Sequence, residues 1–388
     1  MFSTRVPADR STNRFSQALA SARARGAVID LTSTNPTRAG FEYPGDLLAP
    51  LADAAALSYN PSASGLQDAR DAVAESYAAR GLAIEADRIV LTASTSEAYS
   101  LLFKLLCEPG QSRVLTPAPS YPLFDHLTAL DGVEQARYHL EYHGAWTVDV
   151  ESVDAAWTDA TRAVLAVTPN NPTGSILHDG DAEELASRCA ARSAALIVDE
   201  VFCDYPLAGT ALSEPAALHR PACLTFRLGG LSKTVGLPQV KLGWIAVQGP
   251  SPLVNEALDR LELICDTYLS VSTPVQLAAR HLLTHGAVVR EQIQARVKQN
   301  YSALTRILSS GAATVLAAEG GWSAVIRVPS THGEETLVLE LLERDGVVVH
   351  PGYFFDFAHE AFLVVSLLPV PETFARGVHL IQDRLNAS

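Results

Sequence analysis

Lys233 is the residue whose surroundings in the sequence most clearly point to chemistry. It lies in Gly-Gly-Leu-Ser-Lys-Thr-Val-Gly-Leu-Pro (229–238), and Asp199 ends an apolar, strand-like run upstream. Asn-Pro-Thr-Gly (171–174) precedes both. A lysine that can form a Schiff base and a carboxylate that can pair with a pyridinium nitrogen are the protein groups that pyridoxal 5'-phosphate requires. Their order and spacing together predict a pyridoxal phosphate site around Lys233.

The neighbours of Lys233 predict that its side chain is buried. Leu231, Val235 and Leu237 surround it in a glycine-rich turn, and Ser232 precedes it directly. Burial lowers the pKa of a lysine and makes its amine nucleophilic. An isolated Ser-Lys pair is more often part of a surface turn, so the prediction depends on this apolar context.

Asp199 and Asn171 each follow a strand-like run. The carboxyl ends of parallel strands are where open α/β sheets bind their ligands. Asp199 would keep the cofactor's ring nitrogen protonated, so that the ring can accept carbanion electrons. The Asn171 amide could form a hydrogen bond with the ring hydroxyl. The plainer alternatives are a helix-capping or loop aspartate and an ordinary Asn-Pro turn.

Three hydroxyl residues, Ser94, Thr95 and Ser96, stand between a strand-like run and a helical pattern. Backbone N–H groups at a helix N-terminus, supported by hydroxyls, form an anion site suited to a phosphate. Simple N-capping is the alternative, and it is compatible with phosphate binding. Tyr121, in Pro-Ser-Tyr-Pro, follows the next strand-like run and could stack on the cofactor ring.

Strand-like runs alternate with helical patterns through most of the chain, and these elements must position the candidate residues. We expect strands at 88–92, 113–116, 163–168, 194–199, 223–227 and 242–247, and helices at 96–107, 121–130 and 181–191. This alternation predicts an α/β domain with a mainly parallel sheet flanked by helices. Residues 46–285 are therefore expected to form a large cofactor-binding domain.

The pattern changes after about residue 285. We expect a long helix at 289–308, strands at 313–316, 323–328 and 363–366, and further helices at 334–344 and 371–385. This predicts a smaller α+β unit. Residues 28–31 read as a short strand that needs a sheet, so residues 1–45 are expected to join residues 286–388 as an N-terminal arm.

Composition excludes several classes of function. The net charge of -14 argues against nucleic acid or an anionic membrane as the main partner, because both need a basic surface. The five cysteines lack paired spacing and mostly lie in apolar surroundings, so buried reduced thiols are expected and no metal site is predicted. Without an apolar leader or a long apolar stretch, we expect a cytoplasmic protein.

Taken together, these motifs resemble the class I/II aminotransferases, the aspartate-aminotransferase-type family of fold type I. The resemblance extends from the Asn35-Pro36 loop to the last helix. It implies a large domain with a mainly parallel, seven-stranded-type sheet and a smaller α+β domain. It also implies the following roles: Schiff-base formation for Lys233, contact with the pyridine nitrogen for Asp199, contact with the ring oxygen for Asn171, ring stacking for Tyr121, and phosphate binding for Ser94, Thr95 and Ser96. Ser232, beside the lysine, is a further cofactor-binding candidate.

Tyr59 carries a further implication of the resemblance. In Tyr-Asn-Pro-Ser-Ala-Ser-Gly-Leu it is similar to the family tyrosine that reaches the phosphate of the neighbouring subunit, with one extra residue before Gly65. The resemblance therefore implies a homodimer with shared active sites.

Four positions depart from the family pattern. Lys241 stands where the family has an arginine, and it would supply charge to the phosphate without a bidentate fork. Gly230 replaces a serine. Phe202 replaces a tyrosine, which removes one hydrogen bond to the ring oxygen. Val364 replaces the arginine that grips the substrate α-carboxylate in an Arg-x-Ser motif.

The valine at position 364 leaves the substrate open. Either another cation binds the carboxylate, with Arg38 and Arg327 as candidates, or the substrate is not a standard α-amino acid. Asn35, on the loop before Arg38, is a further candidate for substrate binding. The sequence near Tyr268 offers no second arginine for a side-chain carboxylate, which disfavours aspartate and glutamate.

These observations predict a pyridoxal phosphate-dependent aminotransferase that moves an amino group between an amino donor and an oxo-acid acceptor through a Lys233 aldimine. Lys233 would act as general acid–base, with Asp199 stabilising the carbanion. A β-eliminating lyase or a decarboxylase of the same fold is the first alternative, because one carbanion can partition several ways. A non-catalytic regulator is the second, but such proteins carry an additional N-terminal DNA-binding region.

Overall fold

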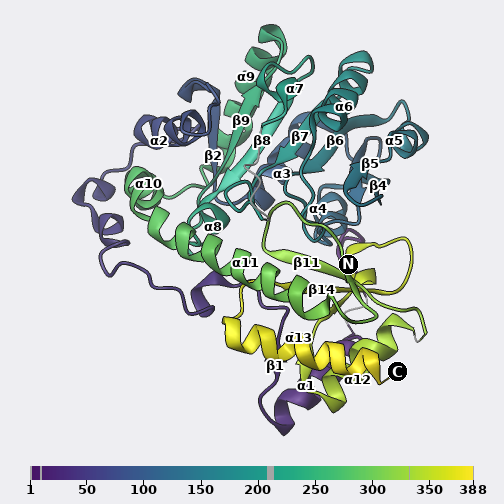
Figure 1. Cartoon of the computed structure of the whole chain (residues 1–388). Coiled ribbons are helices and arrows are strands. Elements are labelled where there is room, and N and C mark those ends of the chain that lie inside the picture. The colour runs from purple at the N-terminus through teal and green to yellow at the C-terminus, as the bar shows by residue number, and fades with distance from the viewer. Residues whose placement is uncertain (1, 9–10, 208–213, 332, 388) are drawn as a thin grey trace.

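The computed structural model describes residues 2–8, 11–207, 214–331 and 333–387. Figure 1 shows a large sheet flanked by helices and, beside it, a smaller unit that contains the C-terminal strands and helices. The long helix α11 (Ala287–Leu308) runs along the smaller unit, next to the C-terminal helix α13 (Pro371–Asn386).

The large sheet has eight strands in the order β2-β9-β8-β7-β6-β3-β4-β5. Its strands are β2 (Ile89–Thr92), β3 (Arg113–Ala118), β4 (Glu134–Tyr142), β5 (Trp146–Val148), β6 (Thr161–Val167), β7 (Ala195–Asp199), β8 (Thr225–Gly230) and β9 (Gly243–Gln248). The run from β8 through β7, β6 and β3 to β4 is parallel. The mainly parallel α/β sheet is thus confirmed. The expected seven-stranded type gains an eighth strand because β4 folds back into a short hairpin with β5.

Helices cover both faces of this sheet. They are α2 (Gln67–Ala78), α3 (Thr95–Leu106), α4 (Phe124–Asp131), α5 (Val150–Ala156), α6 (Asp179–Ala191), α7 (Ala216–His219), α8 (Leu231–Thr234), α9 (Ser251–Tyr268) and α10 (Thr273–His285). Along β7, Ala195 and Ile197 pack into one apolar cluster, whereas Leu196 and Val198 pack into another. This alternation follows from the two-residue period of a strand. It directs Asp199 to the same face as Ile197, where Tyr99 of α3 also lies.

The smaller unit contains two sheets. A four-stranded antiparallel sheet has the order β10 (Thr314–Val315), β11 (Ser323–Arg327), β14 (Phe362–Ser366) and β13 (His350–Pro351). The short strands β1 (Ile29–Asp30) and β12 (Val347–Val348) pair in parallel. Helices α1 (Arg14–Arg25) and α12 (Glu334–Arg344) lie against each other beside them. The pairing of β1 with β12 supports the expected N-terminal arm, and the boundaries at residues 45 and 285 stay a prediction.

Short 3-10 helices complete the fold: η1 (Pro36–Arg38), η2 (Ala49–Ala52), η3 (Ala54–Leu57), η4 (Ala86–Arg88) and η5 (Gly352–Phe355). Within the described residues, no helix is long and apolar enough to span a membrane, and no cluster of His, Cys, Asp and Glu is suited to a metal ion. All five cysteines are free thiols, and four of them are buried.

Candidate active site

The carboxyl ends of neighbouring strands bring Asp199 and Lys233 together. Asp199 is the last residue of β7, and it pairs with Leu228 of the parallel strand β8. Two residues later β8 ends at Gly230, and the chain turns into α8, whose third residue is Lys233. The positive charge of Lys233 opposes the pKa rise of Asp199, and the Asp199 carboxylate opposes the pKa fall of Lys233. The two residues predicted to carry the chemistry therefore share one site.

The Asp199 carboxylate is buried and held by two hydrogen bonds. The Tyr99 hydroxyl donates to one oxygen at 2.9 Å, and the backbone N–H of Val201 donates to the other at 3.1 Å. Burial raises the pKa of Asp199 to about 6, although these hydrogen bonds oppose the rise. A buried carboxylate with a raised pKa is poised to pair with a cationic N–H group.

Lys233 is largely buried beneath aromatic rings. Its Nζ lies 5.0 Å from the ring centroid of Trp322 and 5.8 Å from that of Phe202. Burial lowers the pKa of Lys233, which favours the neutral, nucleophilic amine. The Tyr205 hydroxyl donates a hydrogen bond to the backbone carbonyl of Lys233 and so fixes the α8 turn.

The two consecutive asparagines after β6 have different environments. Asn170 is buried, and it donates to the Pro119 carbonyl at 3.0 Å and accepts from Ser120 at 2.8 Å. Asn171 is partly exposed, and its side-chain oxygen accepts a hydrogen bond from Ser323 of β11 at 3.3 Å. Asn170 therefore anchors the loop, while Asn171 lies where the large sheet meets the smaller unit.

Tyr121 lies near the same carboxylate. Burial raises the pKa of Tyr121, and the charge of Asp199 raises it further, which indicates that the two side chains are close. The ring of Tyr121 makes an edge contact with Phe124 at a centroid distance of 6.3 Å and remains 43% exposed. This leaves part of the ring free for a stacking partner.

The N-terminus of α3 has backbone N–H groups that are available to a ligand. Ser94 is the N-cap, and its hydroxyl accepts from the Glu97 N–H at 3.2 Å. The backbone N–H groups of Thr95 and Ser96, the next two residues, have no recorded partner among the described residues. Such unpaired N–H groups at the positive end of a helix attract anions.

Lys241 and Gly230 lie near this helix end. Gly243 pairs with Thr92, and a Cβ built on it would lie 3.0 Å from the Ser94 carbonyl carbon. Lys241 lies two residues before Gly243, and it is exposed, with a φ of 64°.

A Cβ built on Gly230 would lie 3.0 Å from the Leu242 carbonyl oxygen, so crowding gives a physical reason for glycine where the family has serine. Ser232 is partly exposed in α8.

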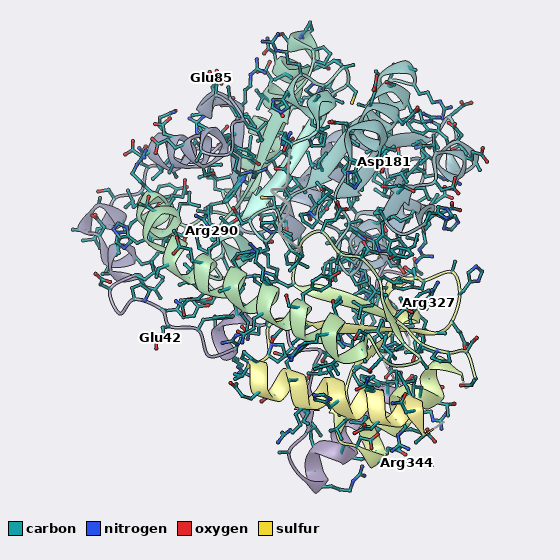
Figure 2. The ribbon with its side chains drawn as sticks, in the orientation of Figure 1. Glu42, Glu85, Asp181, Arg290, Arg327 and Arg344 are labelled. Carbon is teal, nitrogen blue, oxygen red and sulfur yellow. The ribbon has the colours of Figure 1, made fainter. Side chains whose placement is uncertain are left out.

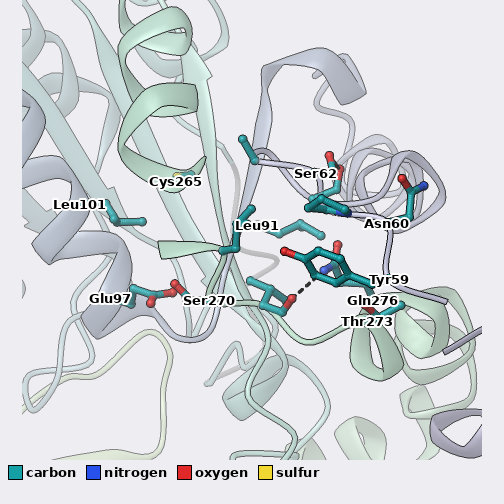
Figure 3. Close-up of a pocket in the computed structure, with 15 residues that line it drawn as sticks. Tyr59, Asn60, Ser62, Leu91, Glu97, Leu101, Cys265, Ser270, Thr273 and Gln276 are labelled. Carbon is teal, nitrogen blue, oxygen red and sulfur yellow. Dashed lines mark hydrogen bonds between the residues drawn. The ribbon is translucent and has the colours of Figure 1, made fainter. Parts of the chain in front are cut away.

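Tyr59 lies in a pocket beside α3 (Figure 3). The pocket is lined by Tyr59, Glu97, Gln276 and the C-terminal end of α9, and Tyr59 and Glu97 lie on opposite sides of it. Tyr59 is 79% exposed. Its ring is thus available at the surface, as the resemblance requires for a contact with another subunit.

The substrate-binding candidates fall in different places. Asn35 is exposed and caps η1 by accepting from the Thr37 N–H at 3.1 Å, and Arg38 is exposed at the end of η1. The nearby Ser33 carbonyl accepts from Ser366, which pairs with Ser323. The loop before η1 therefore contacts the β14 residue that pairs with Ser323, and Ser323 is the β11 residue that bonds Asn171.

Arg327 is not brought to this end. It is the last residue of β11, four residues beyond Ser323, and it is exposed at the edge of the smaller unit (Figure 2). At about 3.3 Å of rise per residue, its backbone lies roughly 13 Å from that of Ser323. Val364 pairs with Val325 in the middle of the same sheet and is buried in an apolar cluster with Trp146, Leu316 and Phe355.

Two residues of the site were missed by the sequence analysis. Tyr99 lies three residues after Ser96 in α3, so the helical period places it one turn below the candidate phosphate site. That spacing was the available signal for Tyr99. Trp322 directly precedes the predicted strand at 323–328, but nothing in the sequence indicates that its ring lies over Lys233.

Comparisons with known proteins support one reading of this geometry. The family model described as aminotransferase class I and II matches residues 47–373. The glutamate-pyruvate aminotransferase AlaA of Haemophilus influenzae is 24% identical over 355 residues, covering 88% of this chain and 86% of that protein. The alanine aminotransferase of Mycobacterium tuberculosis is 25% identical over 368 residues, covering 92% of this chain and 85% of that protein.

Solved structures show the same fold. An alanine aminotransferase from Pyrococcus furiosus matches with a TM-score of 0.88 at 22% identity, covering the whole of both chains. A mutant of the Thermus thermophilus aspartate aminotransferase matches with a TM-score of 0.85 at 21% identity, covering 99% of this chain and 100% of that one.

Proposed function

The chain belongs to the aminotransferase class I and II family and is an aminotransferase, and we propose that it uses pyridoxal 5'-phosphate bound at Lys233. The observation that carries the proposal is the buried pair of Lys233 and Asp199, whose pKa values are shifted in opposite directions. Titratable groups with such shifted pKa values are typical of active sites.

The residues fit this cofactor. When bound, pyridoxal phosphate supplies an aldehyde for Schiff-base formation and a ring that accepts electrons. A lysine with a lowered pKa suits the aldehyde, and Asp199 suits a protonated ring nitrogen because a cation beside it would offset the cost of burying its charge. The free N–H groups of Thr95 and Ser96 suit the phosphate.

The roles of the catalytic residues follow from this fit. Lys233 would take a proton from the substrate carbon as general base and, as general acid, would deliver it to the carbon of the cofactor's aldehyde group. Tyr99 and the Val201 N–H orient Asp199, so that its carboxylate keeps the ring nitrogen protonated. Asn171 donates from its amide nitrogen toward the ring oxygen, since its amide oxygen is already bonded to Ser323.

Other residues hold the remaining parts of the cofactor. Tyr121 stacks on the ring with its exposed face. The phosphate is bound by the α3 N-terminus and by Ser94, Ser232 and Lys241. We further propose a cytoplasmic homodimer in which the exposed Tyr59 of each subunit reaches the phosphate of the other.

The amino donor is an α-amino acid or a related amine, and the acceptor is an oxo acid. Relatives named as alanine and glutamate-pyruvate aminotransferases make small α-amino acids the first substrates to test. Arg38 is the better-placed carboxylate ligand, because the loop before it contacts Ser366 whereas Arg327 lies at the far end of β11. Val364 itself is buried among apolar side chains, so the corresponding amines without a carboxylate belong in the same panel.

The test is a half-reaction with the purified protein loaded with pyridoxal phosphate. An aminotransferase converts the bound cofactor to its amine form and releases an oxo acid, whereas a lyase releases ammonia and regenerates the aldehyde form. Lys233→Ala should remove both the borohydride-reducible cofactor linkage and turnover. Lys298→Ala, on the exposed face of α11, is the matched control. A reducible linkage in Lys233→Ala, or ammonia in place of the amine form, would contradict the proposal.

A further inference from the structure

Trp322 has a buried hydrogen-bond donor without an acceptor. Its side chain is 1% exposed, and its indole Nε1–H has no partner among the described residues. Leaving such a group unpaired costs about 1–3 kcal/mol, and native proteins rarely do so. An acceptor supplied by a bound molecule is the simplest way to satisfy it.

The position of the indole indicates which molecule that is. Its ring lies 5.0 Å from Lys233 Nζ and makes edge contacts with Phe202 at 5.4 Å and Tyr205 at 5.1 Å. The next residue, Ser323, bonds Asn171 at 3.3 Å. Trp322 thus forms part of the wall beside the Lys233 amine, on the side where the smaller unit meets the large sheet.

Neither neighbouring aromatic residue pairs with the indole. The Tyr205 hydroxyl donates to the Lys233 carbonyl and forms no hydrogen bond with Trp322 in the described structure, and Phe202 has no polar atom. By contrast, the Trp244 indole donates to the Tyr77 hydroxyl at 3.2 Å. Trp146 also has an unpartnered indole N–H among the described residues, but it is buried in an apolar cluster with Leu316, Val325, Phe355 and Val364 and makes a ring contact to Tyr142.

We propose that Trp322 is a cofactor-binding residue whose Nε1–H donates a hydrogen bond to the ring oxygen of the cofactor held at Lys233. This rests on the proposed function. The ring oxygen is the expected acceptor because it is attached next to the carbon that bears the aldehyde, and the aldehyde is the group that joins Lys233. Phe202 offers no hydroxyl to this oxygen, so the indole supplies a second donor beside the amide nitrogen of Asn171.

A donor at this oxygen has a measurable electrostatic effect. It stabilises the oxygen's negative charge and weakens the oxygen's attraction for the proton on the lysine nitrogen. The indole should therefore lower the pH at which the absorbance of the bound cofactor changes with loss of that proton. Removing the indole N–H should raise that pH.

The experiment compares Trp322→Phe with Trp146→Phe in the intact protein. Each removes one buried, unpartnered indole and keeps an aromatic ring, but only Trp322 adjoins Lys233. Cofactor affinity is measured by equilibrium dialysis, and the pH midpoint by absorbance. Trp322→Phe should weaken cofactor binding about tenfold or more, the loss expected for a hydrogen bond to a charged group. It should also raise the pH midpoint, whereas Trp146→Phe should change neither.

An analogue of the cofactor that lacks the ring oxygen separates the hydrogen bond from packing. The wild type should bind the analogue more weakly than the cofactor, and Trp322→Phe should discriminate less between the two. Equal discrimination by both proteins, or an unchanged pH midpoint in Trp322→Phe, would overturn the inference. If the wild type itself forms no covalent linkage between Lys233 and the cofactor, the proposed function is wrong.

A second measurement does not depend on a variant that folds. The chain has four tryptophans, and with their indole nitrogens labelled, one N–H resonance should move downfield when the wild type binds the cofactor. No downfield shift among the four would count against the hydrogen bond.

Discussion

The pairing of a buried carboxylate with a buried amine has consequences that reach beyond catalysis. Burial disfavours the charged form of Asp199, and the Val201 N–H, the Tyr99 hydroxyl and the Lys233 charge offset part of this cost. In the protein without cofactor these interactions do not fully offset the effect of burial, since the pKa of Asp199 stays above its usual range. The site is therefore expected to reduce stability until a cationic ligand binds.

Asp199→Asn should change how the stability of the cofactor-free protein depends on pH. Because the folded pKa is raised from 3.8 to about 6, the stability from protonated Asp199 is fully present below the unfolded pKa and lost as pH rises through the folded pKa. A shift of this size corresponds to about 3 kcal/mol between about pH 4 and pH 7.

Urea unfolding of both proteins across this range provides the measurement. The stability of Asp199→Asn relative to the wild type should increase with pH, while cofactor affinity and turnover should fall. Asp87→Asn, at an exposed position, is the control. A stability difference that stays constant with pH would contradict the expectation.

Lys241 is expected to contribute charge to the phosphate without the geometry of an arginine. Lys241→Ala should weaken cofactor binding about ten- to a hundredfold, the loss of a charge-assisted hydrogen bond, and Lys241→Arg should bind as well as the wild type or better. Equilibrium dialysis of the cofactor gives the dissociation constants, with Lys298→Ala as the control. Unchanged affinity in Lys241→Ala would remove it from the site.

The sequence predicts the residues of this site that carry local signals. Lys233 and Asp199 stand in motifs whose neighbours reveal burial and strand ends. Tyr99 has only its helical spacing from Ser96 as a signal, and Trp322 has none, because each reaches Asp199 or Lys233 across about a hundred residues of chain. Their roles depend on tertiary contacts, which no single segment encodes.

At the scale of elements, segments with a clear apolar pattern were predicted closely, whereas a strand of mixed polarity was missed. The helix expected at 334–344 has those bounds in the structure, and the strand expected at 194–199 begins one residue later. Strand β4 was not predicted, because Glu-Gln-Ala-Arg-Tyr-His-Leu-Glu-Tyr mixes polar and apolar residues near the sheet edge. Strand β4 is defined by its parallel pairing with β3, a tertiary contact that its own sequence does not indicate.

One element of the smaller unit depends on a single carboxylate. Glu334, the first residue of α12, is 2% exposed and accepts from the backbone N–H groups of Tyr353, Ala361 and Phe362. These donors belong to η5 and to the start of β14. Through η5, the Phe355 carbonyl accepts from the Ser120 N–H at 3.0 Å, so this carboxylate supports the contact beside Tyr121.

Glu334→Ala should therefore destabilise the protein by about 3 kcal/mol or more, because buried N–H groups lose their acceptor. The adjacent Glu335→Ala is a matched control, since Glu335 is 44% exposed at its side chain and pairs with the exposed Arg14. That change should cost under about 1 kcal/mol. Urea unfolding measures both, and equal losses would show that Glu334 is not a buried anchor.

At the scale of the whole molecule, the site lies where the large sheet and the smaller unit meet. Asn171 and Ser323 are in contact across this junction, as are Ser120 and Phe355. A second surface lies around the pocket of Tyr59, which adjoins the C-terminal end of α9. Leu57 and Tyr59, and Leu263 and Tyr268 of α9, are exposed large side chains. An interface with a second subunit would cover such side chains.

Mixing two defective variants tests whether the sites are shared across a dimer. Lys233→Ala and Tyr59→Ala homodimers should each be nearly inactive at low cofactor concentration, since one lacks the amine and the other a phosphate ligand. If Tyr59 serves the neighbouring subunit, each mixed dimer contains one site with both residues intact. Unfolding and refolding an equal mixture should then recover about a quarter of wild-type activity, the share expected from random pairing in a two-fold dimer.

The same mixture also distinguishes this arrangement from one in which Tyr59 serves its own subunit. If Tyr59 acts on the phosphate of its own subunit, the Tyr59→Ala subunit keeps its defect in every dimer, and the mixture gains nothing over the two variants alone. Joint refolding of Lys233→Ala with Lys241→Ala gives the reference for that case, because both residues of this pair are proposed to serve one subunit's site. Recovery in the Tyr59 mixture alone would establish a site that a single chain cannot complete, whereas equal recovery in both mixtures would place Tyr59 with its own subunit.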